Sequence, residues 1–158
     1  MTYENGVIVT RNEVNPILTI AIVTFNSEST LKKCFNSVFS QNCSKDSYEV
    51  LVVDAGSSDN TLNIVKELQV RVIVEVGCTR GHARNICLDE AKGSLIAMVD
   101  SDIVLPQNWI SSILKYFDDS SLDAVSCPYR TPMPKLGFLG KIIYYFTSGW
   151  AAYNKLGD

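Results

Sequence analysis

The sequence predicts an α/β fold in which helices cover both faces of a mostly parallel sheet. Short apolar segments rich in β-branched residues alternate along the chain with segments whose apolar residues recur at helical spacing. Strand–helix–strand connections of this kind place successive strands parallel to one another, with the helices packed on the sheet. A third observation is that polar residues follow the predicted strands at their carboxyl ends, where such sheets bind ligands.

The first strand is predicted over residues 17–23, a short run of apolar and β-branched residues typical of a strand buried on both faces. The helix after it has apolar residues at positions i, i+3, i+4, i+7 and i+8: Leu31, Cys34, Phe35, Val38 and Phe39. Asn26, Ser27 and Ser29 are the candidate N-caps of this helix.

Residues 50–53 and 70–76 are predicted as the second and third strands. The helix between them is marked by Leu62, Val65 and Leu68, with Ser57, Ser58 or Asp59 as its cap. The next helix is marked by Ala83, Ile86, Cys87 and Ala91. We expect Gly93 to end it in a left-handed cap.

Residues 95–99 are predicted as the fourth strand. Pro106 is expected to be the first residue of the last helix, because proline is favoured at that position. The residues of this helix expected to face the core are Trp109, Ile110, Ile113, Leu114 and Phe117. Residues 122–126 are a candidate for a last strand.

Polar clusters follow three of the strands: residues 24–26, 54–59 and 100–102. The last is an aspartate pair, Asp100 and Asp102, at the end of an apolar strand. Ionised aspartate is almost never fully buried without a partner, so this pair is expected at the rim of the sheet, where it can hold a hard cation that binds phosphates. The alternative is a simple turn, since Asp and Ser are common turn formers.

Composition limits the classes of function. The chain has 158 residues and a net charge of −3, which suits one domain and gives no basic field to attract nucleic acid. Its five cysteines are odd in number and form no C-x-x-C pair, which favours reduced, mostly buried thiols. The first residues do not resemble a signal peptide, so we expect a cytoplasmic protein.

Several phosphate-binding and hydrolytic motifs are missing. The turn after the first strand has no glycine, which argues against the G-x-G-x-x-G and P-loop classes. It also makes a nucleotidyltransferase with a glycine-rich basic loop less favoured. His82 is the single histidine, and no G-x-S-x-G segment is present. We therefore expect a bound diphosphate to be held mainly through a metal, the task that the aspartate pair can perform.

Four segments carry a resemblance to a known family. Residues 19–26, 52–61, 83–85 and 99–102 resemble, in order and spacing, the motifs of family 2 glycosyltransferases of the GT-A fold. The resemblance covers about residues 17–127. It implies a Rossmann-like, nucleotide-sugar-binding domain over residues 1–127, a UDP- or GDP-sugar as donor, and Mg²⁺ or Mn²⁺ as cofactor.

The resemblance also implies a set of site residues. Thr24 and Asn26 match the wall of the nucleoside pocket, Asp54 the base-binding block, Asp100 the position near the sugar and ribose, and Asp102 the metal ligand. Ala55 stands where the family often has a second aspartate, which leaves the choice of base open. An arginine at the start of the third helix can contact the base or diphosphate, or pair with Asp54 or Asp100. The implied donor-binding residues are Thr24, Phe25, Asn26, Asp54, Arg80, Gly81, Arg84, Asp100 and Ser101, and the implied metal ligands are Asp102 and Asp100.

The implied reaction is glycosyl transfer with inversion, which needs a general base beside the acceptor hydroxyl. The acids after Asp102 are Asp118, Asp119, Asp123 and Asp158, and none is a credible base, so that role is unassigned. Two hypotheses remain: a metal-dependent glycosyltransferase that acts on a saccharide or lipid acceptor, and a donor-binding module or subunit without turnover.

Residues 128–158 are expected to form a separate region, a proline-containing linker followed by an apolar, aromatic tail over residues 136–153. The tail is interpreted as an acceptor-side helix or as an interfacial helix at the inner face of the membrane. We expect a chain truncated on the acceptor side, with self-association or peripheral membrane contact through this tail.

Overall fold

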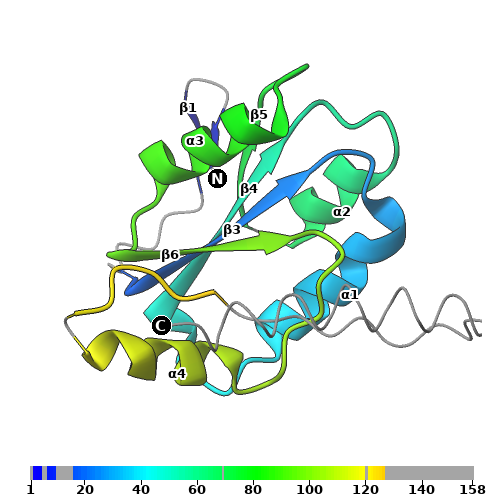
Figure 1. Cartoon of the computed structure of the whole chain (residues 1–158). Helices are drawn as coiled ribbons and strands as arrows, with labels where there is room; N and C mark the ends of the chain where they lie inside the picture. The colour runs from blue at the N-terminus through cyan, green and yellow to red at the C-terminus, as the bar shows by residue number, and fades with distance from the viewer. Residues whose placement is uncertain (1, 5–6, 10–15, 69, 120, 127–158) are drawn as a thin grey trace, which may run out of the picture. The chain divides into compact units, whose positions relative to one another are not determined.

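Four neighbouring strands of a sheet are parallel, and helices cover both faces of this sheet (Figure 1). The structure, a computed structural model, describes residues 2–4, 7–9, 16–68, 70–119 and 121–126. The chain divides into two units, residues 1–115 and 116–158, and the sheet belongs to the first. The prediction of an α/β fold with a mostly parallel sheet is confirmed.

The sheet has the strand order β1-β2-β5-β4-β3-β6. Its strands are β1 (Thr2–Glu4), β2 (Val7–Val9), β3 (Leu18–Thr24), β4 (Tyr48–Asp54), β5 (Arg71–Val74) and β6 (Leu95–Asp100). The pairs β5–β4, β4–β3 and β3–β6 are parallel, as βαβ crossovers require. The β1–β2 hairpin, which the sequence did not indicate, adds to β5 in the antiparallel sense.

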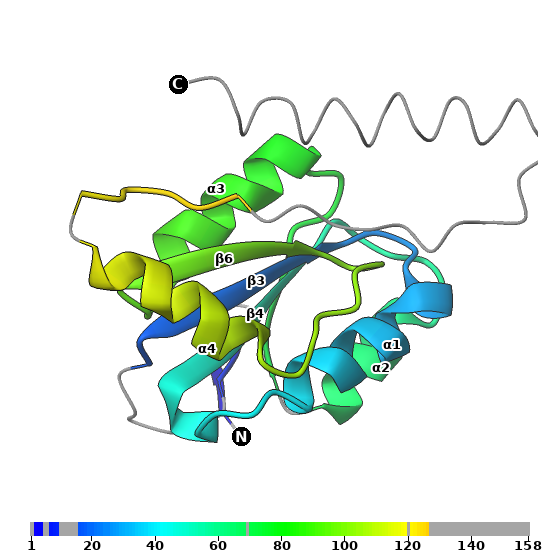
Figure 2. The ribbon, with the colours of Figure 1, turned by 60° about the horizontal axis from the view of Figure 1, so that its bottom comes forward.

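The helices follow the predicted alternation with the strands. They are α1 (Glu28–Phe39), α2 (Thr61–Glu67), α3 (Arg80–Glu90) and α4 (Trp109–Leu114), with the 3₁₀ turns η1 (Lys45–Ser47) and η2 (Lys115–Asp118). Figure 2 shows α3 on one face of the sheet and α1, α2 and α4 on the other.

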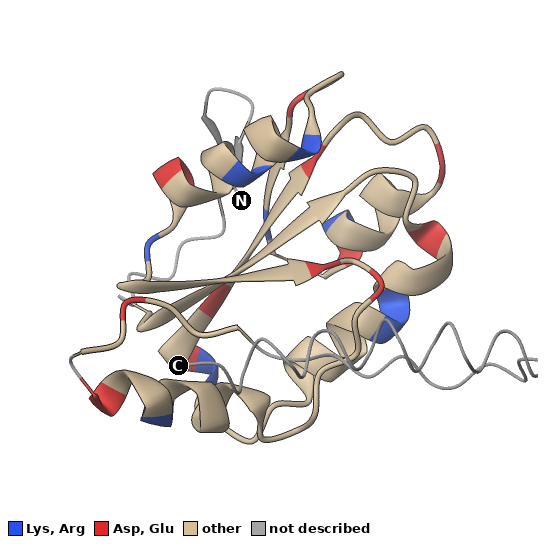
Figure 3. Ribbon diagram, viewed as in Figure 1, with Lys and Arg blue, Asp and Glu red and all other residues tan. Residues whose placement is uncertain are grey.

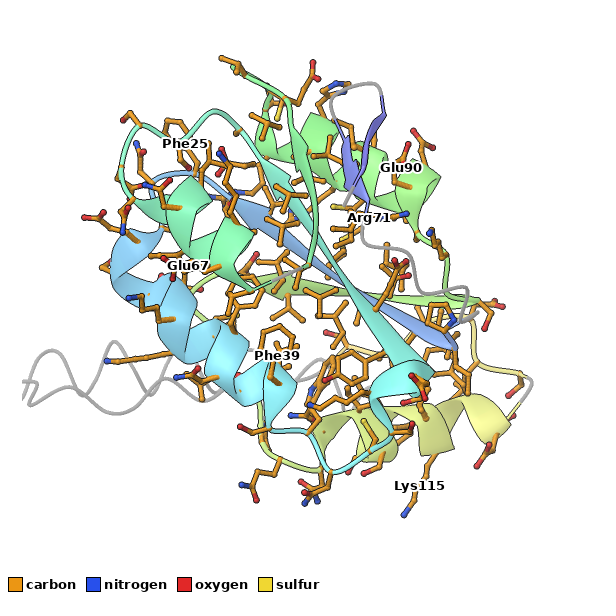
Figure 4. All side chains as sticks on the ribbon, turned by 180° about the vertical axis from the view of Figure 1, so that it is seen from behind. Phe25, Phe39, Glu67, Arg71, Glu90 and Lys115 are labelled. Atoms are coloured by element: carbon orange, nitrogen blue, oxygen red, sulfur yellow. The ribbon has the colours of Figure 1, made fainter. Side chains whose placement is uncertain are left out.

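Alternate residues of the central strands face two separate cores, because successive strand side chains point to opposite faces. Ile20 and Ile22 pack with α1, α2 and α4, where Phe35 and Phe39 stack with ring centroids 5.8 Å apart (Figure 4). Ala21 packs against α3 in a smaller core. The buried members of that smaller core are Ala21, Leu51, Val53, Ala83 and Cys87.

A polar network joins the amino-terminal ends of β3 and β4 to the end of α3. The Glu49 carboxylate accepts hydrogen bonds from the Thr19 hydroxyl at 2.7 Å and from the Lys92 amide at 2.7 Å, and it lies 3.8 Å from the Arg71 guanidinium. Arg71 also donates to the Glu90 carbonyl (Figure 4). These contacts fix the direction in which the chain enters β6.

Two predictions about helix ends are wrong. Helix α3 ends at Glu90, followed by Ala91 in an extended conformation, so Gly93 is not its left-handed cap. Gly93 is required for another reason: a Cβ there would lie 2.5 Å from the Thr19 amide nitrogen. Helix α4 begins at Trp109, so Pro106 precedes it, and the Pro106 carbonyl accepts a hydrogen bond from Trp109 instead.

Two further predictions differ from the structure. The N-cap of α2 is Asn60 rather than one of the three residues proposed, although Asp59 accepts a hydrogen bond from the Thr61 amide. Residues 122–126 form no strand. Only part of this five-residue segment is apolar or β-branched. The pattern is therefore too short to distinguish a strand from irregular structure.

The predicted linker and tail over residues 128–158 lie outside the described residues. Among the residues that the structure describes, no helix has the length and apolar content needed to cross a membrane.

Candidate functional site

Register brings the carboxyl ends of three strands to one edge of the sheet. Thr24 at the end of β3 pairs with Asp54 at the end of β4, and Val23 pairs with Asp100 at the end of β6. Residues that lie 30 and 77 positions apart in the sequence therefore become neighbours in adjacent strands. This edge is where the sequence placed the site.

Asp54 is completely buried and accepts four hydrogen bonds. Its Oδ1 accepts from the amides of Gly56 at 2.9 Å and Ser57 at 2.7 Å. Its Oδ2 accepts from the hydroxyls of Thr24 at 2.7 Å and Ser57 at 2.6 Å. This arrangement satisfies a buried carboxylate, so Asp54 organises the loop after β4.

Asn26 holds the loops after β3 and β4 together. It adopts a left-handed conformation, φ 50°, which asparagine tolerates better than most residues. Its amide donates to the Ser57 hydroxyl at 2.8 Å, and its side-chain oxygen accepts from the Ser58 amide at 2.9 Å. Asn26 is exposed at this edge of the sheet.

Gly56 allows the same loop to approach the end of β5. Its φ is +92°, and a Cβ would lie 3.1 Å from Val76 Cγ1 and 3.2 Å from Val76 Cα. A side chain at this position would be strained by both the backbone conformation and the contact. The glycine therefore serves backbone packing.

The N-termini of α1 and α2 cap each other. Asp59 Oδ2 accepts from the Glu28 amide at 3.1 Å, and Glu28 Oε2 accepts from the Asn60 amide at 2.8 Å. Partial desolvation of Asp59 opposes its ionisation, but hydrogen bonds from Thr61 and the Glu28 amide outweigh this and lower its pKa. Negative side chains at helix N-termini are also favoured by the helix dipole.

Asp100 pairs with Arg84, one of the two alternatives that the sequence left open for this arginine. Arg84 Nη2 lies 3.3 Å from Asp100 Oδ1, and both side chains are substantially exposed. Figure 3 shows basic residues on α3 and acidic residues at the end of β6. Solvent weakens an exposed pair of this kind, so its main effect is to orient the carboxylate.

Asp102 is exposed, and within residues 70–119 no hydrogen bond or ion pair ends on its carboxylate. Ser101, between the two aspartates, places its Oγ 3.0 Å from Ser27 Oγ. The described residues contain no group of three or more metal-ligating side chains. Two carboxylates fit a cation such as Mg²⁺, which keeps several waters and takes substrate phosphates as further ligands.

The remaining predicted residues lie at the start of α3 and at the end of β3. Arg80 and Gly81 form the exposed first turn of α3, where the Thr79 hydroxyl accepts from the His82 amide at 3.2 Å. Phe25 is 60% exposed and stands apart from the core (Figure 4). No side-chain hydrogen bond or ion pair in the described part of the chain joins Phe25, Arg80 or Gly81 to the other predicted residues.

Sequence reasoning missed the connecting roles of Ser57 and Thr61. Ser57 links Asn26 to Asp54, and Thr61 Oγ1 accepts from the Ser27 amide at 2.8 Å. Both residues fall inside or next to the predicted cap of α2. A cap pattern is local, whereas these bonds reach another loop, so the sequence held no signal for them.

The acids that follow Asp102 lie outside the unit that contains the sheet. Asp118, Asp119 and Asp123 are exposed and belong to the second unit, and Asp158 lies outside the described residues. Hydrogen bonds from Ser121 lower the pKa of Asp119 and favour its ionised form. The general base stays unassigned.

Comparison with known proteins decides the family. The profile described as glycosyl transferase family 2 matches residues 19–153, which include the strand ends described above. This chain belongs to glycosyl transferase family 2. The four sequence segments that resembled this family all lie inside the match.

Individual family members agree with the assignment. The chain is 29% identical over 139 residues to glycosyltransferase AglE of Haloferax volcanii, covering 84% of this chain and 46% of AglE. It superposes on a mannosyltransferase of Pyrobaculum calidifontis, in complex with GDP-Man and Mn²⁺, with a TM-score of 0.65 and 28% identity. That match covers 73% of this chain and 36% of the mannosyltransferase.

A crystal structure of residues 1–349 of Staphylococcus aureus TarS gives a TM-score of 0.60 at 25% identity, covering 71% of this chain and 38% of that fragment. The chain thus spans less than half the length of these relatives. The likeness confirms the Rossmann-like GT-A fold predicted from the sequence.

Proposed function

We propose that this chain is the nucleotide-sugar-binding part of a glycosyltransferase that moves a sugar from a UDP- or GDP-sugar to an acceptor hydroxyl. The observation that carries the proposal is the exposed carboxylate pair Asp100 and Asp102 at the carboxyl end of β6 in a family 2 domain. Related structures support a donor of this class, because one holds GDP-Man with Mn²⁺ and TarS has been solved with UDP and with UDP-GlcNAc.

Asp102 and Asp100 are the residues that would hold Mg²⁺ or Mn²⁺. When bound, the cation supplies positive charge that offsets the charge of the departing diphosphate. Oxygen ligands of this kind suit Mg²⁺ or Mn²⁺ rather than zinc. Arg84 pairs with Oδ1 of Asp100 and so orients this carboxylate. The other oxygen, Oδ2, is not part of this ion pair.

The remaining donor contacts are assigned to the exposed residues of the same edge. An aromatic ring and an amide are exposed at the end of β3, on Phe25 and Asn26. A cation and a helix N-terminus are exposed at the start of α3, at Arg80 and Gly81. These groups suit a base, a ribose and a diphosphate. Attack by the acceptor hydroxyl on the anomeric carbon would expel the nucleoside diphosphate and invert the configuration.

A second candidate is a donor-binding module without turnover. The observation in its favour is that Asp118, Asp119 and Asp123, the described acids after Asp102, lie exposed in the second unit. Such a module would bind the donor and need an acceptor half from elsewhere.

Calorimetric titration with UDP and with GDP, each with and without Mn²⁺, tests the binding premise. We expect one nucleotide to bind, with affinity raised tenfold or more by Mn²⁺, the order of effect of one well-placed charge contact, about 1.4 kcal/mol. Asp102→Ala should abolish the gain from Mn²⁺, while Asp89→Ala, an exposed change on α3, should preserve it. Absence of binding at millimolar nucleotide would contradict both candidates.

Release of nucleoside diphosphate separates the enzyme from the module. The chain is incubated with a panel of nucleotide sugars, Mn²⁺, and saccharide or lipid acceptors. Acceptor-dependent release supports the transferase. Tight, metal-dependent binding without release supports the module.

The proposal has three further parts. We place the protein in the cytoplasm and the domain boundary between residues 127 and 128. We also propose that residues 136–153 contact a membrane or a second copy of the chain. Flotation of the chain with anionic vesicles, compared with a chain ending at residue 135, tests the membrane contact. Light scattering of the same two chains tests self-association.

A further inference from the structure

We propose that Ser27 is a positioning residue that orders the turn carrying Asp100 and Asp102. The inference rests on the proposed donor site and adds a residue to it. Ser27 is 8% exposed and contacts neither aspartate side chain. It acts on them through Ser101, the residue between them.

The Ser27 hydroxyl is free from the task that its position in the sequence suggests. Ser27 is the N-cap residue of α1, but its side chain makes no capping hydrogen bond. Asp59 from the β4–α2 loop accepts from the Glu28 amide at 3.1 Å instead. Because another loop caps α1, the hydroxyl of Ser27 can be used elsewhere.

That hydroxyl lies 3.0 Å from the hydroxyl of Ser101. Its other polar neighbours, the amide and carbonyl of Phe25, are both 3.4 Å away, at the limit of a hydrogen bond. The Ser27 amide donates to Thr61 Oγ1 at 2.8 Å. Ser27 therefore connects the loop after β3, the start of α2 and the turn after β6.

The same face of α1, together with Gln41 just beyond the end of the helix, holds the rest of the segment that follows β6. The Cys34 thiol, seven residues and about two turns from Ser27, lies 3.8 Å from the Asp100 carbonyl. The Ser37 hydroxyl accepts from the Leu105 amide at 2.9 Å. Gln41 donates to the Pro106 carbonyl at 2.6 Å and accepts from the Ile110 amide at 3.0 Å.

Residues 101–108 form no helix or strand, so such side chains supply hydrogen bonds to their backbone in addition to a few backbone bonds, among them Ile103 to Asp100. Ser37 and Gln41 hold the far end of this segment. Within the described chain, Ser27 supplies the hydrogen bond to the side chain between the two aspartates. Loss of this bond should loosen the turn while the end at Ser37 and Gln41 stays in place.

Ser27→Ala tests the proposal, because it removes the hydroxyl and keeps the amide that donates to Thr61. Ser29→Ala, an exposed position two residues later, is the matched control. The first readout is hydrogen exchange of the Ile103 amide, which donates to the Asp100 carbonyl at 3.0 Å. We expect Ser27→Ala to raise this exchange about two- to tenfold, the range equivalent to one net hydrogen bond.

The second readout is the gain in UDP or GDP affinity on addition of Mn²⁺. Ser27→Ala should reduce this gain about two- to tenfold and leave the metal-free affinity unchanged, a split that general destabilisation would not produce. Ser101→Ala removes the partner from outside α1, and the double variant should be no worse than either single one.

The proposal is overturned if Ser27→Ala behaves like Ser29→Ala in exchange, or if the effects of Ser27→Ala and Ser101→Ala add. An equal loss of metal-free and metal-dependent affinity also overturns it, since that is the result of a purely structural role. If the unaltered chain binds no nucleotide, the proposed function fails, and the exchange of Ile103 alone then decides whether Ser27 orders the turn.

Discussion

Asp54 shows how one residue can look like a ligand contact in the sequence and serve the protein's own backbone in the structure. All four of its hydrogen bonds come from Thr24, Gly56 and Ser57, and the side chain is inaccessible to solvent. The base-binding role that the family resemblance implies stays a prediction. Asp54 could accept a hydrogen bond from a base only by giving up one of these donors.

Asp54→Ala should therefore destabilise the fold by about 3 kcal/mol, because it leaves several buried donors without an acceptor. Thr24→Val removes only one donor with little change of shape and should cost about 1 kcal/mol. Urea denaturation measures both. An Asp54→Ala variant as stable as Thr24→Val, but weaker in nucleotide binding, would favour the ligand role instead.

The buried cysteines agree with the predicted class of reduced thiols. Cys34 and Cys87 are buried, Cys43 and Cys78 are half-buried, and all four are free. Burial, with the nearby Asp102 carboxylate as a smaller cause, raises the pKa of the Cys34 thiol to about 12. Cys127 lies outside the described residues.

At the scale of the elements, α1 and α2 depend on each other for their N-terminal hydrogen bonds. Asp59 accepts from the first residue of α1, and Glu28 accepts from the N-cap of α2. Neither helix satisfies these amides by itself. The loops after β3 and β4 are consequently joined at the edge where the proposed donor site lies.

This dependence predicts an effect of pH. The pKa of Asp59 is lowered in the folded chain, so its contribution to stability is complete above its unfolded pKa, about 3.9, and is lost as the pH falls through the folded value. Asp59→Asn should destabilise the chain at pH 7, and the difference from the unaltered chain should shrink below about pH 4.

Urea denaturation at pH 7 and pH 3 measures the difference. Asp46→Asn, an exposed aspartate in η1, is the control for a simple change of net charge. A difference that is the same at both pH values would mean that the ionised form of Asp59 does not cap α1.

At the scale of the whole molecule, burial decreases from the centre of the sheet toward β6. Residues of β3 and β4 are almost all buried, whereas β6 has one buried residue, Val99, and Met98 is 40% exposed. Among the strands that the structure describes, β6 pairs with β3 alone. The strand that carries the proposed metal ligands is thus the least protected of these three.

Hydrogen exchange should follow this gradient. Amides of β3 and β4 have paired strands on both sides and should exchange at least about tenfold more slowly than those of β6, because opening β6 breaks fewer buried contacts. Mass spectrometry of peptides that span residues 18–24, 48–54 and 95–100 measures the order. Equal protection of β6 would contradict this prediction.

Much of this architecture was accessible from the sequence. Strands and helices over residues 17–114 were predicted because burial imposes its period on neighbouring residues, 2 in a strand and 3.6 in a helix. The alternation then fixed parallel pairing, and the family motifs indicated which strand ends matter. Helix ends were predicted less well, because the contacts made by Gly93 and Pro106 involve residues far away in the sequence. Gly93 lies against Thr19, and the Pro106 carbonyl accepts a hydrogen bond from Gln41.

The sequence by itself determined the α/β class and the parallel core, and it predicted a donor site at the carboxyl ends of the strands. Only the tertiary structure decided how the site residues are used: Asp54 buried in its own loop, Arg84 paired with Asp100, and Ser27 joined to Ser101 across 74 positions. The physical reason is the range of the interactions. Periodic burial can be predicted from residues that are neighbours in the sequence. A hydrogen bond between distant loops depends instead on strand order and register, which bring the partners within reach.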